Sequence, residues 1–302
     1  MIPRHRTHDR ELPPFPSRAG DGLIDPHSPE EPPMPGETRI GSRPTPQDVA
    51  RRCLILRYMV ITAIVTPPRG MVEALMAKWS DEEREKFQAD AVARQEGLYR
   101  AVRDHGLWDH ASPTEREIFL TNALTITVKQ QITASWRLES AQVLMWALGL
   151  VSALPPYDAD ASRDLVKLIP SSDPTDFIAK ARLRIPKAID QARSVAEFWH
   201  WRSRTRQLIA EGRPFPVNAK MAAKGIRSYD DIVSISARKG AADGVLPPAI
   251  AGDFAVMGKA YRDLTTQEWA KVRSITMERH VALNWMCGYA PDNRWDDTPT
   301  ET

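Results

Sequence analysis

The stretch ITVKQQITASWRLESAQVLMWALG, residues 126–149, decides the fold. It contains no proline, and its second half is apolar on nearly every side of a helix, which is typical of a buried helix. Gly149 follows the last apolar residue, and glycine is the residue type that most often follows a helix end. The sequence therefore predicts a long central helix over about 126–149.

Helix-start signals recur along the rest of the chain. The segment 45–48 (TPQD) combines an N-cap residue, a proline at the first helical position and an acid in the first turn. The segments 80–83 (SDEE) and 112–115 (SPTE) have the spacing of capping boxes. No sustained alternating pattern predicts a strand, although 254–258 (FAVMG) is ambiguous. We expect helices at about 46–65, 70–78, 80–105, 112–120, 126–149, 160–169, 173–183, 186–210, 228–239 and 266–287.

These elements predict an all-α protein with a single multi-helix globular domain at 45–302, less regular at about 212–264. Residues 1–44 differ, because they are rich in proline and in charged and small polar residues. Such a segment buries too little apolar surface to offset its chain entropy, so we expect a disordered Pro-rich arm. Its PPFP sequence at 13–16 could dock on a protein partner as a polyproline segment, whereas a solvated tail is the simpler interpretation.

Composition and charge argue against several classes of function. Lys and Arg number 41 against 39 Asp and Glu, so the net charge of +2 creates no strong field that favours nucleic acid or a membrane surface. No apolar run approaches the roughly 18 residues of a membrane span, and the first residues lack the apolar core of a secretory signal. Cys53 and Cys287 fall in apolar helical patterns and are expected to be reduced and buried. We therefore expect a cytoplasmic protein that binds neither nucleic acid nor membrane.

Four charged residues interrupt otherwise apolar helical stripes. Arg137 and Glu139 lie on the central helix, where they project about 200° apart and cannot pair with each other. Glu278 and Arg279 lie on the last long helix among apolar neighbours. A buried charge without a partner costs several kcal/mol, so partners are expected across helices. The simplest arrangement pairs Glu139 with Arg279, and Arg137 with Glu278 or with an aspartate of the tail.

The last eight residues, WDDTPTET, add further candidates. We expect Trp295 to fold back on the last helix as an anchor, with Asp296 and Asp297 as partners for Arg137 or Arg279. Two interpretations of these charges remain open: a buried ion-pair network that fixes helix register, or a polar site that binds a ligand or catalyses a reaction. The candidate polar cluster comprises Trp136, Arg137, Glu139, Glu278, Arg279, Trp285, Trp295, Asp296 and Asp297.

No familiar catalytic or metal-binding motif accompanies this cluster. The sequence lacks GxGxxG, Walker, HExxH and GxSxG motifs, and no nucleophile with its base can be identified. His105 and His110 fit no standard zinc pattern, and His280 with Cys287 suggests a packed thiol more than a two-ligand metal site. The aspartate pair of the tail alone has too few ligands for calcium. We therefore expect no cofactor or metal, and favour a binding or accessory protein without catalysis. The alternative is an enzyme or small-ligand binder with a polar Arg/Glu/Asp pocket between the central and C-terminal helices.

Three segments together resemble a bacterial family, domain of unknown function 4272: 132–150 (ITASWRLESAQVLMWALGL), 277–289 (MERHVALNWMCGY) and 294–302 (RWDDTPTET). The likeness spans about 48–302 and implies a helical domain without an established activity. One departure is Glu301, where the family ending has an aspartate, so a tight geometric role there is in doubt. The resemblance maps onto Trp136, Arg137, Glu139, Trp146, Glu278, Arg279, Trp285, Trp295, Asp296, Asp297, Thr300 and Thr302.

Overall fold

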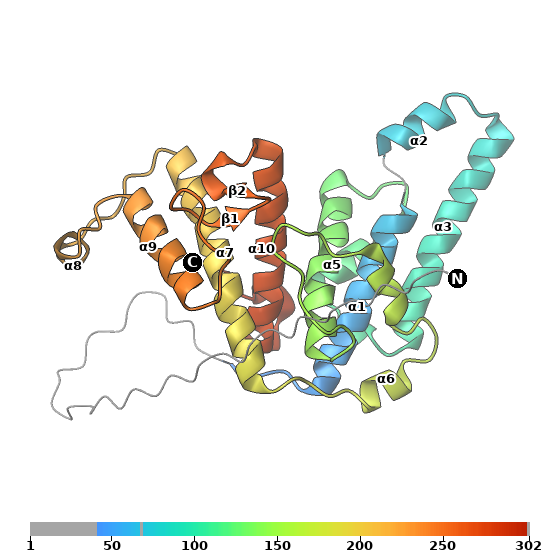
Figure 1. The fold of residues 1–302 in the computed structure, drawn as a ribbon. Coiled ribbons are helices and arrows are strands. Elements are labelled where there is room, and N and C mark those ends of the chain that lie inside the picture. The colour runs from blue at the N-terminus through green and yellow to red at the C-terminus, as the bar shows by residue number, and fades with distance from the viewer. Residues whose placement is uncertain (1–40, 67–68, 301–302) are drawn as a thin grey trace, which may run out of the picture.

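A computed structural model gives the fold and describes residues 41–66 and 69–300. The protein is all-α, as predicted, apart from one short hairpin within the described residues (Figure 1). Its α-helices are α1 (Pro46–Val65), α2 (Arg69–Met76), α3 (Asp81–Asp104), α4 (Pro113–Leu120), α5 (Val128–Ala147), α6 (Thr175–Ala179), α7 (Pro186–Ala210), α8 (Ala219–Ala223), α9 (Tyr229–Ala242) and α10 (Thr266–Met286). Short 3-10 turns lie at Trp108–His110, Arg163–Leu168, Tyr261–Asp263, Pro291–Asn293 and Trp295–Asp297.

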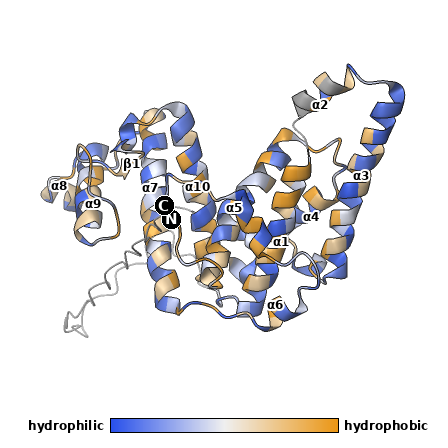
Figure 2. Cartoon of the chain, turned by 45° about the vertical axis from the view of Figure 1, so that its right-hand side comes forward, coloured by the Kyte–Doolittle hydropathy of each residue, from blue (hydrophilic) through white to orange (hydrophobic). Residues whose placement is uncertain are grey.

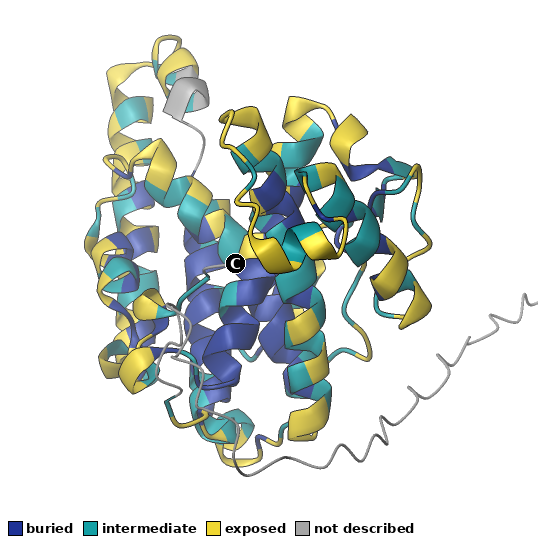
Figure 3. Ribbon diagram, turned by 90° about the vertical axis from the view of Figure 1, so that its left-hand side faces the viewer, coloured by how far each residue is buried: buried dark blue, intermediate teal, exposed yellow. Residues whose placement is uncertain are grey.

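Four long helices form the body of the molecule as a row in the order α7, α10, α5 and α1 (Figure 1). The helices α3, α4 and α6 contact α1, and α9 contacts α7. Buried residues gather on the helices in the middle of the molecule (Figure 3). By contrast α3 is mostly hydrophilic and has few buried residues (Figure 2). The core therefore runs along the row, and α5 packs against α1 on one side and α10 on the other.

The central helix α5 begins and ends where its sequence predicts. Thr127 caps its start, and the Gln130 side chain reaches back to the Thr127 backbone, which completes a capping box. At the other end Gly149 adopts a φ of +78°, which glycine tolerates without strain. The N–H of Leu150 then donates to the carbonyl of Met145 at 2.9 Å, so the chain turns away sharply after the helix.

Two predicted helices are shorter in the structure than in the sequence analysis. Residues 160–169 form only the 3-10 turn Arg163–Leu168, and the helix predicted at 173–183 is confined to α6. Proline at the first position of α7 disfavours helical geometry at the preceding residue, Ile185, so the chain approaches α7 extended. Within that extended stretch the N–H of Arg184 donates to the carbonyl of Ala147 at the end of α5, at 2.9 Å.

The less regular segment 212–264 contains α8, α9 and the hairpin. Strand β1 (Ala255–Val256) pairs antiparallel with β2 (Lys259–Ala260), which resolves the ambiguous stretch 254–258 as part of a hairpin. A buried ion pair fixes this segment to α7, because the Arg202 guanidinium donates to both carboxylate oxygens of Asp253 at 2.7 and 2.6 Å.

The sequence predicts a disordered arm at residues 1–44, of which residues 1–40 lie outside the described residues. Residues 41–44 contact the folded body. The N–H of Gly41 donates to the carbonyl of Gly288, and Arg43 pairs with Asp190 at 2.5 Å. A Cβ at Gly288 would lie 2.6 Å from the Gly41 carbonyl oxygen, so a side chain there would push this segment off the end of α10.

Both cysteines are buried and unpaired, as predicted. Burial raises the pKa of the Cys53 thiol to about 12. For Cys287, burial and then the neighbouring Asp190 carboxylate raise the pKa to about 12. Because the thiolate is the reactive form, both side chains act as inert packing groups near neutral pH.

A pair of histidines links α7 to α10. The Nδ1 atoms of His200 and His280 lie 2.9 Å apart, a hydrogen bond that requires one neutral ring to donate and the other to accept. Burial lowers the pKa of His200 to about 4, with added repulsion from Arg273 and Arg204. Burial also lowers the pKa of His280 to about 3. Both rings are therefore neutral in the folded protein near neutral pH.

This pair predicts a loss of stability in mild acid. Histidines in the unfolded chain bind protons near pH 6.5, while the folded pair resists protonation until about pH 4, so unfolding takes up protons in between. The free energy of unfolding should fall by up to about 1.4 kcal/mol per pH unit for each histidine below pH 6.5. Urea unfolding between pH 7 and 4.5 measures this, and the double variant H200Q/H280Q should show a flatter profile. An identical profile in the variant would contradict the assignment.

Candidate functional site

Arg279 of α10 and Glu139 of α5 form an ion pair in the core, the arrangement that the helical stripes predict. The guanidinium is 0% exposed, and its Nε and Nη2 atoms lie 3.0 and 2.8 Å from Glu139 Oε2. The other oxygen of Glu139 accepts the N–H of Ala161 at 2.7 Å. Three carbonyls of the loop after α5 accept the remaining guanidinium donors, at 2.8 to 3.1 Å: those of Pro155, Pro156 and Ala159. Every charged atom of the pair thus has a partner.

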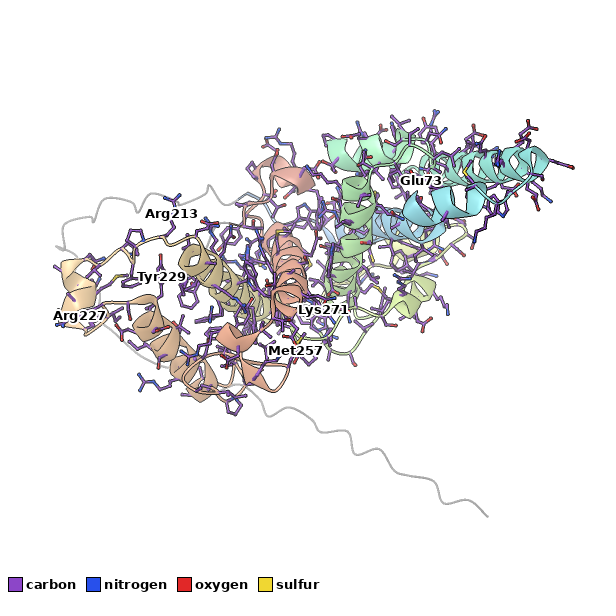
Figure 4. All side chains as sticks on the ribbon, turned by 90° about the horizontal axis from the view of Figure 1, so that it is seen from above. Glu73, Arg213, Arg227, Tyr229, Met257 and Lys271 are labelled. Atoms are coloured by element: carbon purple, nitrogen blue, oxygen red, sulfur yellow. The ribbon has the colours of Figure 1, made fainter. Side chains whose placement is uncertain are left out.

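The loop that Arg279 holds is fixed from a second side by the hairpin and α10. Asp158 accepts the backbone N–H of Met257 at 2.9 Å, and Asp160 pairs with Lys271 at 3.0 Å. Figure 4 labels Met257, between the two strands of the hairpin, and Lys271 on α10. The interior arginine and these outer contacts together attach the loop to both central helices.

Arg137 and Glu278 form a second interhelical pair, also as predicted. The Arg137 Nη1 atom lies 3.2 and 3.1 Å from the two carboxylate oxygens of Glu278. Ser140 donates to Glu278 Oε2 at 2.7 Å. Burial alone would lower the pKa of Arg137, but the negative charges of Glu278 and Glu115 outweigh it and raise the pKa. Arg137 is therefore a permanent cation whose charge Glu278 neutralises.

A third buried pair, Arg52 with Glu115, is absent from the sequence-based cluster. Their Nη1 and Oε2 atoms lie 2.5 Å apart, and Arg52 also donates to the His110 carbonyl at 2.7 Å. The same Glu115 carboxylate accepts the N–H of Ser112 at 2.8 Å in the capping box of α4. The sequence shows the capping box that contains Glu115, and it shows Arg52 as a charge within the apolar run of α1. Each pattern concerns one residue, and neither indicates that the two form a pair.

Trp295 joins two of these pairs. Its indole is 2% exposed, and the guanidinium carbons of Arg52 and Arg137 lie 5.1 and 5.9 Å from the ring. The ring of Trp285, on α10, packs edge to face against the Trp295 ring, with their centroids 5.4 Å apart. The indole N–H of Trp285 also donates to the carbonyl of Asn293 at 2.9 Å. The tail therefore folds back on the last helix through Trp295, as predicted.

The two tail aspartates do not pair with Arg137 or Arg279, so this part of the prediction is wrong. Asp296 accepts the backbone N–H of Thr114 in the first turn of α4 at 3.0 Å, and Asp297 pairs with Arg294 at 3.0 Å. The physical reason is that the two core arginines are already neutralised by glutamates. The start of α4, by contrast, offers backbone donors without helical acceptors.

Two cavities flank the buried pairs. The tail cavity, about 520 Å³, lies between the tail, the start of α1 and the turn before α4, and is lined by Asp48, Arg52, Asp109, His110, Ala111, Ser112, Pro113, Trp285, Asp292, Asn293, Arg294, Trp295, Asp296 and Asp297. The α1–α5 groove, about 480 Å³, is lined by Val60, Ala63, Ile64, Thr66, Gln131, Ile132, Ser135, Trp136, Leu138, Glu139, Asp160, Ala161 and Arg163.

The predicted cluster therefore separates into three groups. Trp285, Trp295, Asp296 and Asp297 line the tail cavity. Trp136 and Glu139 line the α1–α5 groove. The remaining members, Arg137, Glu278 and Arg279, line neither cavity. Within residues 41–66 and 69–300, no three His, Cys, Asp or Glu side chains gather so as to hold a metal ion. Over the same residues, no helix is both long and apolar enough to cross a membrane.

Comparison with known proteins places the chain in a family. The fold and its buried charges define a helical domain, and residues 23–224 match the family described as domain of unknown function (DUF4272). Since the match covers more than half of the chain, the protein belongs to this family. The match contains the 132–150 motif and ends before α10 and the tail. No curated protein matches the chain, and no solved structure matches it.

The packing of Trp295 predicts that the tail stabilises the whole domain. Replacing it by alanine removes a buried indole and its contact with two guanidinium groups, so W295A should lower the free energy of unfolding by about 3–5 kcal/mol. Urea denaturation of full-length protein measures the change. The matched control is R294A, an exposed neighbour, which should stay within about 0.5 kcal/mol. A loss below about 1 kcal/mol in W295A would show that the tail is only loosely attached.

Proposed function

We propose that this protein is a non-catalytic binding protein, and that the tail cavity binds a small organic cation such as a polyamine. The observation that carries the proposal is the charge of the cavity wall. Five aspartates line it against two arginines. One of these arginines, Arg52, is neutralised by Glu115, and the other, Arg294, pairs with Asp297. The wall is thus left with a net negative charge that attracts cations.

Two of these aspartates are available to a ligand. Asp109 and Asp292 are exposed, and no Lys or Arg of the described residues lies within ion-pair distance of either. His110 adds no opposing charge near neutral pH, because burial and the nearby Arg51 lower its pKa. The volume of about 520 Å³ falls in the range of small-molecule sites.

The absence of catalysis is inferred from the state of the interior charges. General acid–base chemistry needs a group that can exchange a proton with a substrate. Both oxygens of Glu139 and of Glu278 are occupied by donors of the protein. Arg279 is equally saturated. Saturated ion pairs of this kind suit a rigid scaffold better than a reaction centre. A cytoplasmic location, inferred from the sequence, is part of the same proposal.

Isothermal titration calorimetry with spermidine at low ionic strength tests the site. The double variant D109N/D292N should raise the Kd by about tenfold or more, since two attractive charges are removed. The matched control is D263N, an exposed aspartate in the 3-10 turn before α10, which should leave the Kd unchanged. Added salt should weaken binding to the wild type, because the site is open to solvent. No detectable heat with spermidine, or an equal Kd in the double variant, would contradict the proposal.

A further inference from the structure

The α1–α5 groove presents apolar surface to solvent on two neighbouring helices. Ile132 of α5 is 51% exposed, and Ile64 near the end of α1 is 48% exposed. Val60 and Leu138 form a buried floor beneath them. Contiguous apolar surface of this kind on a protein marks a binding site more often than chance exposure of single residues does.

A second, smaller cavity of about 260 Å³ continues the groove toward α2. The two cavities share Thr66 and Gln131, whose side-chain amide donates to the Thr66 carbonyl at 2.5 Å. Beyond this shared wall the lining is again largely apolar, with Val72, Met76, Leu124, Ile126 and Val128. The result is an elongated apolar trough instead of an isolated pocket.

At the other end of the trough, Arg163 is the cation without an acidic partner among residues 41–66 and 69–300. Asp160 is neutralised by Lys271, and Glu139 by Arg279. Arg163 lines the groove and is exposed, and among the described residues no acid lies within ion-pair distance of it. The groove therefore combines an apolar length with an uncompensated positive charge at the 160–163 loop.

We propose that this groove binds an amphiphile with an alkyl chain and an anionic carboxylate head. The chain lies along Ile132 and Ile64, and the head meets Arg163. A docked helix is a poorer match, since a stable protein interface buries about 800 Å² on each partner, whereas a volume of about 480 Å³ suits a small molecule. This site is separate from the tail cavity and does not depend on the function proposed for it.

Titration of the full-length protein with dodecanoate, below its micelle concentration, tests the proposal by calorimetry. Two variants on exposed positions probe the two halves of the ligand. R163E should raise the Kd of dodecanoate by about fivefold or more, because attraction becomes repulsion. I132N should raise it by about tenfold, because apolar contact with the chain is lost. The matched charge control is R238E, an exposed position on α9, which should leave the Kd unchanged.

Ligand controls separate the head from the chain. Dodecanol, which lacks the charge, should bind the wild type more weakly than dodecanoate and should respond to I132N but not to R163E. The tail-cavity variant D109N/D292N should bind dodecanoate as the wild type does. Failure of the wild type to bind dodecanoate, equal affinity for dodecanol, or an unchanged Kd in both R163E and I132N would overturn the proposal.

Discussion

The structure depends on one buried cation, Arg279, at the contact between α5 and α10. All of the hydrogen-bond partners of its guanidinium belong to the protein. A guanidinium removed from water is tolerated only if its donors and its charge are satisfied, and here Glu139 supplies the charge while three carbonyls accept the remaining donors. Those carbonyls belong to the loop after α5, so the pair fixes two helices and a loop in one arrangement. A shift of either helix along the other would leave both charges buried without partners. This constraint favours one register of α5 against α10.

In the candidate cluster, the buried charges hold the fold together, and the cavities beside them are the candidates for binding. Arg137 and Glu278 complete a second pair on another side of α5, and Trp295 connects it to Arg52 and Glu115. These charges neutralise each other inside the protein, and the binding that we propose falls to the surfaces beside them. The tail cavity is acidic and the α1–α5 groove is apolar with a cation at one end, so the two proposed sites have opposite character. A core in which each buried charge has a partner of opposite sign is well suited to hold such sites at fixed geometry.

The sequence was informative where a pattern is local or periodic. The apolar run and Gly149 located α5, and charges on apolar stripes indicated that Glu139 and Arg279 would meet. It was uninformative where contacts join distant segments without a pattern. The Arg52–Glu115 pair spans 63 residues and the His200–His280 pair spans 80. The path of the tail depends on positive φ angles at Asp292 and Asn293, which residue type alone does not dictate, and so the partners of the tail aspartates were mispredicted.

A double-mutant cycle on Glu139 and Arg279, measured by urea denaturation at pH 7, tests the central claim most directly. E139Q and R279M each leave the opposite charge buried and unpaired, so each should lower the free energy of unfolding by about 3–5 kcal/mol. The double variant leaves no unpaired charge, and its loss should be smaller than the sum of the two by about 2 kcal/mol or more. Small and additive losses would contradict the account, because they would mean that the pair does not constrain the contact between α5 and α10.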